Sequence, residues 1–351
     1  MADLLLRCMS YLHNMNTAYS LLELAVVSQG EDFRKAIQNS AKVAMAAEAA
    51  GYTRIWFAEH HNSENIASSA TSILIGYAAE NTKKIRVGSG GIMLPNHSPL
   101  IIAEQFGTLA HLYPGRIDLG LGRAPGTDPA TAAAIRSDFF KAAQSFPSEV
   151  EKIQEYFSEE NKNSPVRVSI AEGTDVPLYI LGSSTDSAHL AAAKGLPYAF
   201  ASHFATTYLE DALEIYRDEF QSSVQLQQPY TMAGINIIIA DSKEEAEKLF
   251  TSVIKMFIGV ISGARAPLQP PGEMTDDLKE ILLHPVLQQM LKYSFVGDKR
   301  SVKLHVKEFI RKTKVNELIG VFNLYHLSDR INSTRLFAEI MDELNNERDF
   351  G

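Results

Sequence analysis

The feature of this sequence that most limits the possible folds is a repeated alternation between short apolar runs and longer segments with helical spacing. The apolar runs lie at residues 21–27, 54–58, 116–121, 178–181, 198–201, 234–240 and 318–322, and a further one starts at residue 85 and ends before Pro95. Most are continuously apolar, which is typical of parallel strands buried on both faces. The eight strand–helix units predict an α/β fold, a (β/α)8 TIM barrel, with a doubly wound open sheet as the alternative.

The barrel is expected to occupy the whole chain. At 351 residues the chain has the length of a barrel with additions, and no low-complexity linker divides it. We therefore predict one domain over residues 1–351, in which residues 1–18 form a loosely packed N-terminal extension. Two insertions are expected. One follows the fourth strand and has a short strand at 166–170, and the other precedes the eighth strand, at 262–293, where prolines surround a short helical run.

The charge balance and the cysteine content exclude several classes of partner. The formal net charge is −9 and the acidic residues are spread over predicted helices, which leaves no basic patch for nucleic acid or an anionic membrane. Cys8 is the only cysteine, so an internal disulfide is excluded. The apolar run near the N-terminus is too short for a signal peptide, and no run of about 18 apolar residues occurs. These features predict a cytoplasmic protein that binds neither nucleic acid nor a membrane.

The residues that follow the predicted strands are candidates for an active site, because the carboxyl ends of barrel strands meet at one mouth. Glu59, His60 and His61 follow the second strand. Adjacent strand residues point to opposite sides, so Glu59 and His61 are expected on one side and His60 on the other. This arrangement favours a single catalytic or ligand-contacting histidine, His60, over a metal site or a purely structural strand end. Further polar residues at strand ends are Asn96, His203, Asn323, Tyr325 and His326.

Glycines interrupt the third strand and recur around the end of the fourth. Gly90 and Gly91 lie inside the third strand, where glycine usually marks a bulge or the close approach of another backbone or a ligand. Gly120, Gly122 and Gly126 form a GxGxxxG pattern, but the dinucleotide fingerprint needs a further glycine where this chain has proline. Two explanations of these three glycines stay open: the close approach of a planar ligand, and close packing inside the barrel.

An anion site is predicted next to this glycine-rich loop. Arg123 follows the fourth strand, and Ser183 and Ser184 precede the helix after the fifth strand. A helix N-terminus presents N–H groups and the positive end of the helix dipole, and arginine adds a charged, forked donor. The alternative is that Ser184 only caps the helix and Arg123 only forms a salt bridge at the rim.

Long motifs in the chain are specific for one family. They are RIWFAEHHNSENIASSATSILIGYAAE at 54–80, GIMLPNHSPLIIAEQFGTL at 91–109, PGRIDLGLGRAPGTD at 114–128 and PLYILGSSTDSAHLAAAKGLPYAFASH at 177–203. With these motifs the chain, from about residue 21 to residue 344, resembles the bacterial luciferase-like flavin-dependent monooxygenases. It is more similar to single-chain members of the family than to luciferase itself.

The resemblance implies a (β/α)8 barrel with an insertion before the last strand and with FMN as cofactor. Reduced FMN, supplied by a separate flavin reductase, is expected to react with dioxygen and oxidise a small organic substrate, and a deazaflavin is the alternative cofactor. A homodimer is expected as well. Gly122 stands where luciferase has a reactive cysteine, so a thiol is not expected to take part. The insertion at 262–293 resembles the mobile lid of the family, although its sequence differs.

Carried over by position, the resemblance also implies roles for residues of the predicted mouth. His60 matches the histidine that the flavin chemistry requires, and Glu59 beside it is expected to bind the cofactor. Gly90 and Gly91 match a pair that is joined by a cis peptide bond beside the isoalloxazine ring. The other residues implied to bind the cofactor are Arg123, for the phosphate, and Ser183 and Ser184, for the flavin and its phosphate.

The sequence therefore predicts an FMN-dependent monooxygenase with His60 as its catalytic residue. Two other classes remain open. One is a flavin-binding protein without turnover, and the other is a metal-dependent hydrolase on the same barrel that would use Glu59, His60 and His61.

Overall fold

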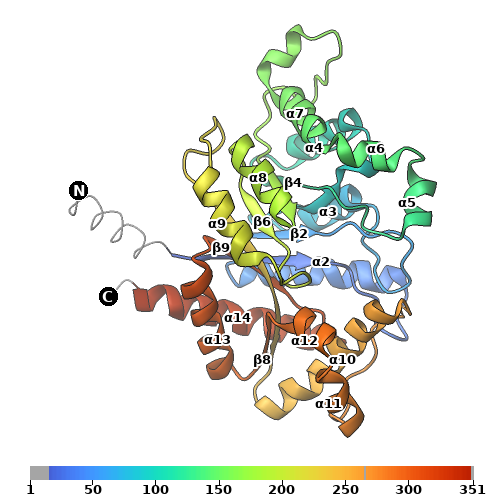
Figure 1. Ribbon diagram of the computed structural model, residues 1–351, viewed down its shortest axis with the longest axis vertical. Helices are drawn as coiled ribbons and strands as arrows, with labels where there is room; N and C mark the ends of the chain where they lie inside the picture. Colours follow the sequence, from blue (N-terminus) through green and yellow to red (C-terminus); the bar gives the residue numbers. More distant parts are fainter. Residues whose placement is uncertain (1–15, 265, 349–351) are drawn as a thin grey trace.

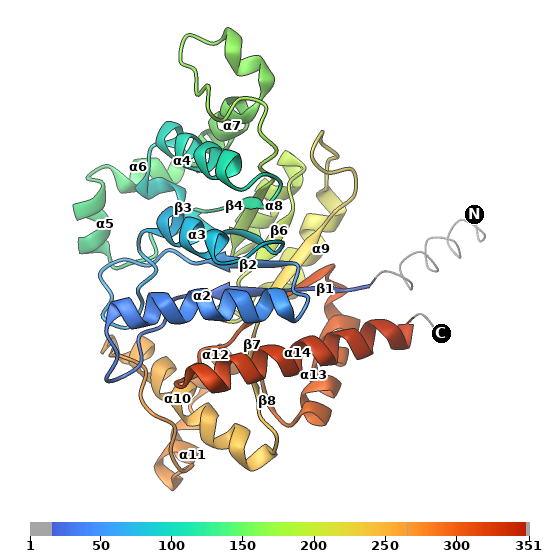
Figure 2. The ribbon, with the colours of Figure 1, turned by 180° about the vertical axis from the view of Figure 1, so that it is seen from behind.

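The computed structural model describes residues 16–264 and 266–348, and its centre is a closed barrel of eight parallel strands (Figures 1 and 2). The strands are hydrogen-bonded in the order β1-β2-β3-β4-β5-β6-β7-β9, and the pairing of β9 with β1 closes the ring. Their bounds are β1 Ala18–Glu23, β2 Arg54–Phe57, β3 Arg86–Met93, β4 Ile117–Gly122, β5 Leu178–Gly182, β6 Tyr198–Phe200, β7 Thr231–Ile239 and β9 Glu317–Val321. The predicted (β/α)8 barrel is confirmed, and closure of the ring rules out the open sheet.

Helices connect the strands and cover the outside of the barrel. The main ones are α2 Phe33–Ala49, α3 Thr71–Glu80, α4 Pro99–Leu112, α8 Thr185–Lys194, α9 Leu209–Glu219, α10 Lys243–Ser262, α13 Lys299–Thr313 and α14 Leu327–Arg348. Local sequence signals set their ends. Asp32, for example, accepts a hydrogen bond from the Lys35 N–H at 2.7 Å and so caps α2. Figure 2 shows α14 alongside α2, so the last helix packs against the helix that follows β1.

Side chains of the strands alternate between the inside of the barrel and the layer under the helices. The inside is filled by one apolar cluster, formed by Leu22, Trp56, Ala58, Tyr179, Ala199, Met232, Ile319 and Val321. On the other side, Ile55, Phe57 and Val87 join a larger core that includes Ile102 and Phe106 of α4. Because both faces of the strands are buried, the strand runs in the sequence are continuously apolar.

The N-terminal end of the barrel interior holds charged side chains that are paired with one another. Arg54 donates from Nη1 to Asp118 Oδ2 at 2.8 Å and from Nε to Glu317 Oε1 at 2.9 Å. The Tyr230 hydroxyl donates to Glu317 Oε2 at 2.7 Å, and Trp56 Nε1 donates to Asp118 Oδ2 at 3.0 Å. Burial alone would lower the pKa of Arg54, but the two carboxylates hold it well above its usual value. This end of the barrel is therefore a closed ionic network.

The insertion after β4 contains three helices, α5 Pro129–Ile135, α6 Phe139–Gln144 and α7 Phe146–Phe157, followed by a 3₁₀ helix, Glu159–Asn163. The short strand predicted at 166–170 is wrong. The Val168 N–H bonds to the Asn161 side chain at 2.9 Å, and the Ala171 N–H bonds to the Val168 carbonyl at 2.8 Å, which makes a turn. A closed barrel offers no free strand edge at this point, so the segment folds back on itself.

The insertion before the last barrel strand lies at the opposite end of the molecule from the first one (Figure 1). It contains α11 Asp276–Leu282 and α12 Pro285–Leu291. Its start is fixed to the barrel, because the Leu268 N–H donates to the Val27 carbonyl and the Leu268 carbonyl accepts from the Gln29 N–H, each at 2.8 Å. Neither this attachment nor the strand at its end, β8 Ser294–Gly297, was predicted from the sequence. β7 pairs with β9 along 232–236 and with β8 along 236–239, so it serves both partners.

The described end of the predicted N-terminal extension is packed rather than loose. The Thr17 N–H donates to Asn345 Oδ1 of α14 at 3.0 Å, and Asn345 Nδ2 donates back to the Thr17 carbonyl at 3.1 Å. Ala18 already belongs to β1. The rest of the predicted extension, Cys8 included, lies outside the described residues. Among the residues that are described, no helix combines the length and the apolar character needed to cross a lipid bilayer.

Candidate active site at the barrel mouth

Two histidines follow strands on opposite sides of the barrel. His60 comes after β2 and His203 after β6, and each continues the inward-facing positions of its strand. The strand order places β2 and β6 four positions apart in the ring of eight. Burial, and secondarily the charge of His60, lower the pKa of His203 to about 4, so the two rings are close enough to interact. His203 is therefore neutral at pH 7.

The glycine-rich loop after β4 holds His60 in place. His60 Nδ1 lies 3.2 Å from the Gly126 carbonyl oxygen, and the His61 N–H donates to the same oxygen at 3.2 Å. Gly126 has φ +64°, and a Cβ here would lie 2.4 Å from the Glu59 carbonyl oxygen. Only glycine permits this conformation and this approach. Close packing, one of the two explanations left open by the sequence, therefore accounts for Gly126.

Glu59 is 1% exposed, and both its carboxylate oxygens accept hydrogen bonds from the protein. Oε1 accepts from His61 Nε2 and His97 Nε2 at 2.9 Å and from Asn96 Nδ2 at 3.0 Å, and Oε2 accepts from the Met93 N–H at 3.0 Å. Burial alone would raise the pKa of Glu59, but these bonds and the charge of His97 lower it to about 2. Glu59 thus ties the end of β2 to the loop before α4, and its expected contact with the cofactor stays a prediction.

Gly90 and Gly91 lie next to each other in β3, and Gly90 is partly exposed whereas Gly91 is buried. The peptide bond between them is cis. A Cβ at Gly90 would lie 2.7 Å from Leu22 and 2.9 Å from Trp56, and one at Gly91 would lie 2.8 Å from the Gly120 carbonyl oxygen. Side chains are therefore excluded at both positions, and Trp56, 1% exposed, packs directly against this backbone.

The structure brings the predicted anion-binding residues to one rim of the mouth. Arg123 Nη2 lies 3.2 Å from Asp186 Oδ2 in the first turn of α8, and both side chains are more than half exposed. Ser184 is the N-cap residue of α8, yet its side chain makes no capping hydrogen bond within the described ranges, whereas α5, α10 and α13 have such caps. Ser183 beside it is exposed. The alternative explanation had two parts. The salt bridge of Arg123 is present, and the cap by Ser184 is not.

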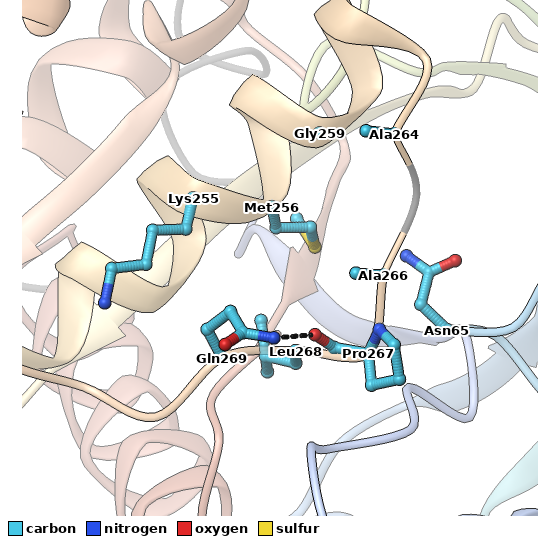
Figure 3. Close-up of a pocket in the computed structure, with 9 residues that line it drawn as sticks. All are labelled: Asn65, Lys255, Met256, Gly259, Ala264, Ala266, Pro267, Leu268 and Gln269. Carbon is cyan, nitrogen blue, oxygen red and sulfur yellow. Dashed lines mark hydrogen bonds between the residues drawn. The ribbon is translucent and has the colours of Figure 1, made fainter.

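A cavity of about 40 Å³ lies beside the mouth, between α10, the segment that follows it and Asn65 from the loop after β2 (Figure 3). Figure 3 shows Lys255 and Met256 of α10 on one side and Pro267 and Leu268 on the other. Such a volume holds a few water molecules and is too small for a flavin. The cavity marks the place where the second insertion meets the loop that follows His60.

The residues suggested for a metal-dependent hydrolase do not converge. Glu59 and His61 are in contact, as the strand alternation predicted, but the ring of His60 lies against the Gly126 carbonyl. Over the part of the chain that the structure describes, no group of three or more His, Cys, Asp or Glu residues is placed to hold a metal ion.

Comparison with known sequences assigns this barrel to a family. Residues 20–289 match the family model described as luciferase-like monooxygenase. A luciferase-like monooxygenase of Escherichia coli K12 is 46% identical over 327 residues, which cover 93% of this chain and 98% of the relative. The N-acetyl-S-alkylcysteine monooxygenase of Bacillus subtilis is 35% identical over 241 residues, which cover 66% of this chain and 71% of that relative.

Solved structures show the same fold. Apo-MsnO8 has 30% sequence identity and a TM-score of 0.85, covering 93% of this chain and 99% of its own. Two more distant structures are alike in fold alone. The FMN complex of the oxygenating constituent of 3,6-diketocamphane monooxygenase from Pseudomonas putida has 17% identity and a TM-score of 0.71, with 93% and 97% coverage. An F420-dependent secondary alcohol dehydrogenase has 15% identity and a TM-score of 0.70, with 93% and 98% coverage.

The family match and these relatives identify the protein as a monooxygenase. The chain belongs to the luciferase-like monooxygenase family, as its motifs predicted.

Proposed function

We propose that the protein uses reduced FMN and dioxygen to oxidise a small organic substrate. The observation that carries this proposal is the combination of bare backbone at Gly90 and Gly91 with an uncapped helix N-terminus beside Arg123. The two parts suit FMN, because a strand without side chains lets its flat ring system approach closely and its phosphate requires donors. Membership of the luciferase-like family favours a flavin in the same place.

The phosphate is proposed to bind at the rim formed by α8 and Arg123. The first turn of α8 offers N–H groups and the positive end of its dipole, and Ser183 and Ser184 add hydroxyl groups. Arg123 adds two parallel donors to an anion. Its present partner, Asp186, is exposed, so the phosphate can replace that carboxylate at little cost in free energy.

The ring system is proposed to lie on the backbone of Gly90 and Gly91. When bound, reduced flavin supplies the chemistry that activates dioxygen. The protein positions the ring and handles protons, and His60 is proposed for the second task because it follows β2, the strand next to β3. The contact between His60 Nδ1 and the Gly126 carbonyl orients the imidazole for proton exchange.

The remaining parts of the proposal concern partners. A separate flavin reductase supplies reduced FMN, and the chain acts as a homodimer. The second insertion acts as a lid that keeps water from the mouth, which its contact with the loop after β6 supports, since Thr206 Oγ1 donates to the Gln289 carbonyl of α12 at 2.7 Å. A deazaflavin is the alternative cofactor, because an F420-dependent dehydrogenase has the same fold.

A fluorescence titration tests the cofactor proposal. Trp56 is the only tryptophan in the sequence and lies against Gly90, so a flavin bound there quenches its emission by energy transfer. We expect reduced FMN to bind more tightly than oxidised FMN, and FMN more tightly than riboflavin. If the protein binds F420 more tightly than FMN, F420 is the cofactor instead of FMN. Absence of quenching by every flavin would overturn the site.

Replacement of His60 tests the proton-handling role. His60→Ala should lower turnover by about 10²-fold, because that is the low end of what a general acid or base contributes, while FMN still binds. Turnover is measured as oxygen consumption with chemically reduced FMN and substrates found by screening. His189→Ala, an exposed histidine on α8, is the matched control. Equal turnover in both variants would refute the role of His60, and no substrate-dependent oxygen consumption by the wild type would favour a binding protein without turnover.

A further inference from the structure

His203 lies at the mouth of the barrel, and the proposed function assigns no role to it. Its Nδ1 atom is buried and has no hydrogen-bond partner among the described residues. A buried polar atom without a partner costs about 1–3 kcal/mol, and such atoms are rare in folded proteins. The residue as a whole is only partly buried, so a ligand can reach other atoms of His203.

The position of the His203 ring depends on a glycine in the neighbouring strand. A Cβ at Gly234 of β7 would lie 2.3 Å from His203 Nδ1, 3.2 Å from its Cγ and 3.3 Å from its Cε1. These three nearest atoms all belong to the imidazole. Gly234 therefore provides the space in which the ring lies.

The main chain on both sides of this contact is fixed as well. Asn236 Nδ2 donates to the His203 carbonyl at 2.7 Å and to Ser294 Oγ of β8 at 3.2 Å. Ser202 Oγ donates to the Gly234 carbonyl at 2.6 Å. The main chain at His203 is thus tied to β7 and, through Asn236, to β8.

We propose that His203 is a second ligand-contacting histidine, which hydrogen-bonds the flavin ring system from the β6–β7 side of the mouth, opposite His60. The proposal rests on the proposed function and adds a contact that does not involve the phosphate. The rim at Arg123 lies at the ends of β4 and β5, the bare backbone lies in β3, and His60 follows β2. For a ring system held between these groups, β6, β7, β9 and β1 form the remaining sides of the barrel, and His203 follows β6.

The protonation of His203 suits this contact. Burial and the charge of His60 lower its pKa to about 4, so it is neutral at pH 7. A neutral imidazole has one donor and one acceptor nitrogen, and the flavin ring system likewise has N–H donors and carbonyl acceptors. His60 then carries the exchangeable proton, and His203 provides a hydrogen bond that does not change with pH near neutrality.

Two substitutions test the proposal by different routes. His203→Ala removes the ring, and Gly234→Ala keeps the ring but displaces it. Each should weaken FMN and riboflavin by the same factor, roughly threefold to tenfold, because one neutral hydrogen bond is lost and the phosphate is not involved. Each should also change the visible absorption spectrum of bound oxidised FMN. Arg123→Ala, in contrast, should weaken FMN alone.

The outcomes separate this proposal from the proposed function. His189→Ala serves as the control and should match the wild type. If both test variants bind both flavins as the wild type does and with the same spectrum, the contact is refuted while the cofactor assignment stands. If the wild type binds neither flavin, the proposed function and this proposal both fail.

A stability measurement shows whether the Gly234→Ala substitution acts through His203 or through general damage to β7. Gly234→Ala should lower the midpoint of urea unfolding, and the double variant His203→Ala/Gly234→Ala should recover most of that loss, because the added methyl group then occupies the space of the missing ring. No recovery in the double variant would mean that the methyl group disturbs something other than His203, and the steric part of the proposal would be overturned.

Discussion

The polar side chains at the N-terminal end of the barrel interior form a paired network, whereas the mouth combines a fully bonded Glu59 with polar groups that are exposed or lack a partner. At the N-terminal end, Arg54, Asp118 and Glu317 are nearly or completely buried, and each is paired with a charged partner. At the C-terminal end, His203 Nδ1 has no partner among the described residues, Ser184 does not cap its helix, and Arg123 is half exposed.

This difference separates stability from function. A paired ionic network requires nothing from outside the protein and fixes the barrel at one end. At the other end, exposed groups such as Arg123 and Ser183 are accessible to a ligand, and barrel enzymes place their active sites at this end. If this comparison is right, substitutions at the N-terminal end change the stability of the fold, and substitutions at the mouth change binding.

The largest expected effect is at the N-terminal end. Glu317→Ala leaves Arg54 Nε and the Tyr230 hydroxyl buried without their acceptor, so we expect a loss of about 3–5 kcal/mol in the free energy of unfolding. Urea denaturation followed by Trp56 emission measures this loss. FMN affinity of the folded protein should stay the same. A loss below about 1 kcal/mol would show that this network does not stabilise the fold.

A smaller effect, dependent on pH, is expected at Glu59. Its pKa is lowered from 4.5 to about 2, so the unfolded chain takes up a proton more readily than the folded one. The stabilisation is therefore complete above pH 4.5 and is lost as the pH falls towards 2, and it amounts to about 3 kcal/mol. Glu59→Gln should flatten the pH dependence of the unfolding free energy in this range, measured by urea denaturation at each pH. An unchanged slope would contradict the role given to Glu59.

At the mouth, replacement of Arg123 should change binding and not stability. Arg123→Ala is expected to weaken FMN about tenfold, or about 1.4 kcal/mol, because a partly exposed charged hydrogen bond is lost. Riboflavin affinity should not change. Titration by Trp56 quenching measures both affinities. An equal loss of affinity for the two flavins would show that the phosphate does not bind at this rim.

The smallest effect is expected on the outer surface, where Lys299 and Lys303 of α13 pair with Glu343 of α14. These side chains are solvated, so Glu343→Ala should cost only about 0.5 kcal/mol, and added salt should remove the difference. The urea midpoint at low and high salt measures this. If Glu343→Ala lowered the free energy of unfolding as much as Glu317→Ala, burial would not explain why the two ion pairs are expected to differ in their contribution to stability.

The barrel could be predicted from the sequence because its strands are buried on both faces. Each strand is therefore a local run of apolar residues that can be recognised by itself. β8 could not be predicted in this way. Its four residues, SFVG, alternate between half-buried and buried positions, and the strand exists only because β7 extends beyond its pairing with β9. How far β7 extends depends on the tertiary structure, so residues 294–297 alone do not show that they form a strand.

The candidate site was predictable where one strand end sets the geometry. The alternation of Glu59, His60 and His61 gave the correct sides for all three residues. His97 was missed, because its contact with Glu59 joins residues 38 positions apart and depends on the path of the loop after β3. His203 was noted only as a polar strand end, because Gly234, which makes room for its ring, lies in another strand.

The double pairing of β7 has a consequence for protein engineering. The stretch from Asn236 to Ile239 is covered along one edge by β8, which closes the second insertion. A shortened chain without this insertion and β8 would expose that edge, with three consecutive isoleucines, as an unpaired apolar strand. Such edges recruit strands from other molecules, so the shortened barrel should aggregate. A shortened chain should therefore keep β8, whatever replaces the insertion before it.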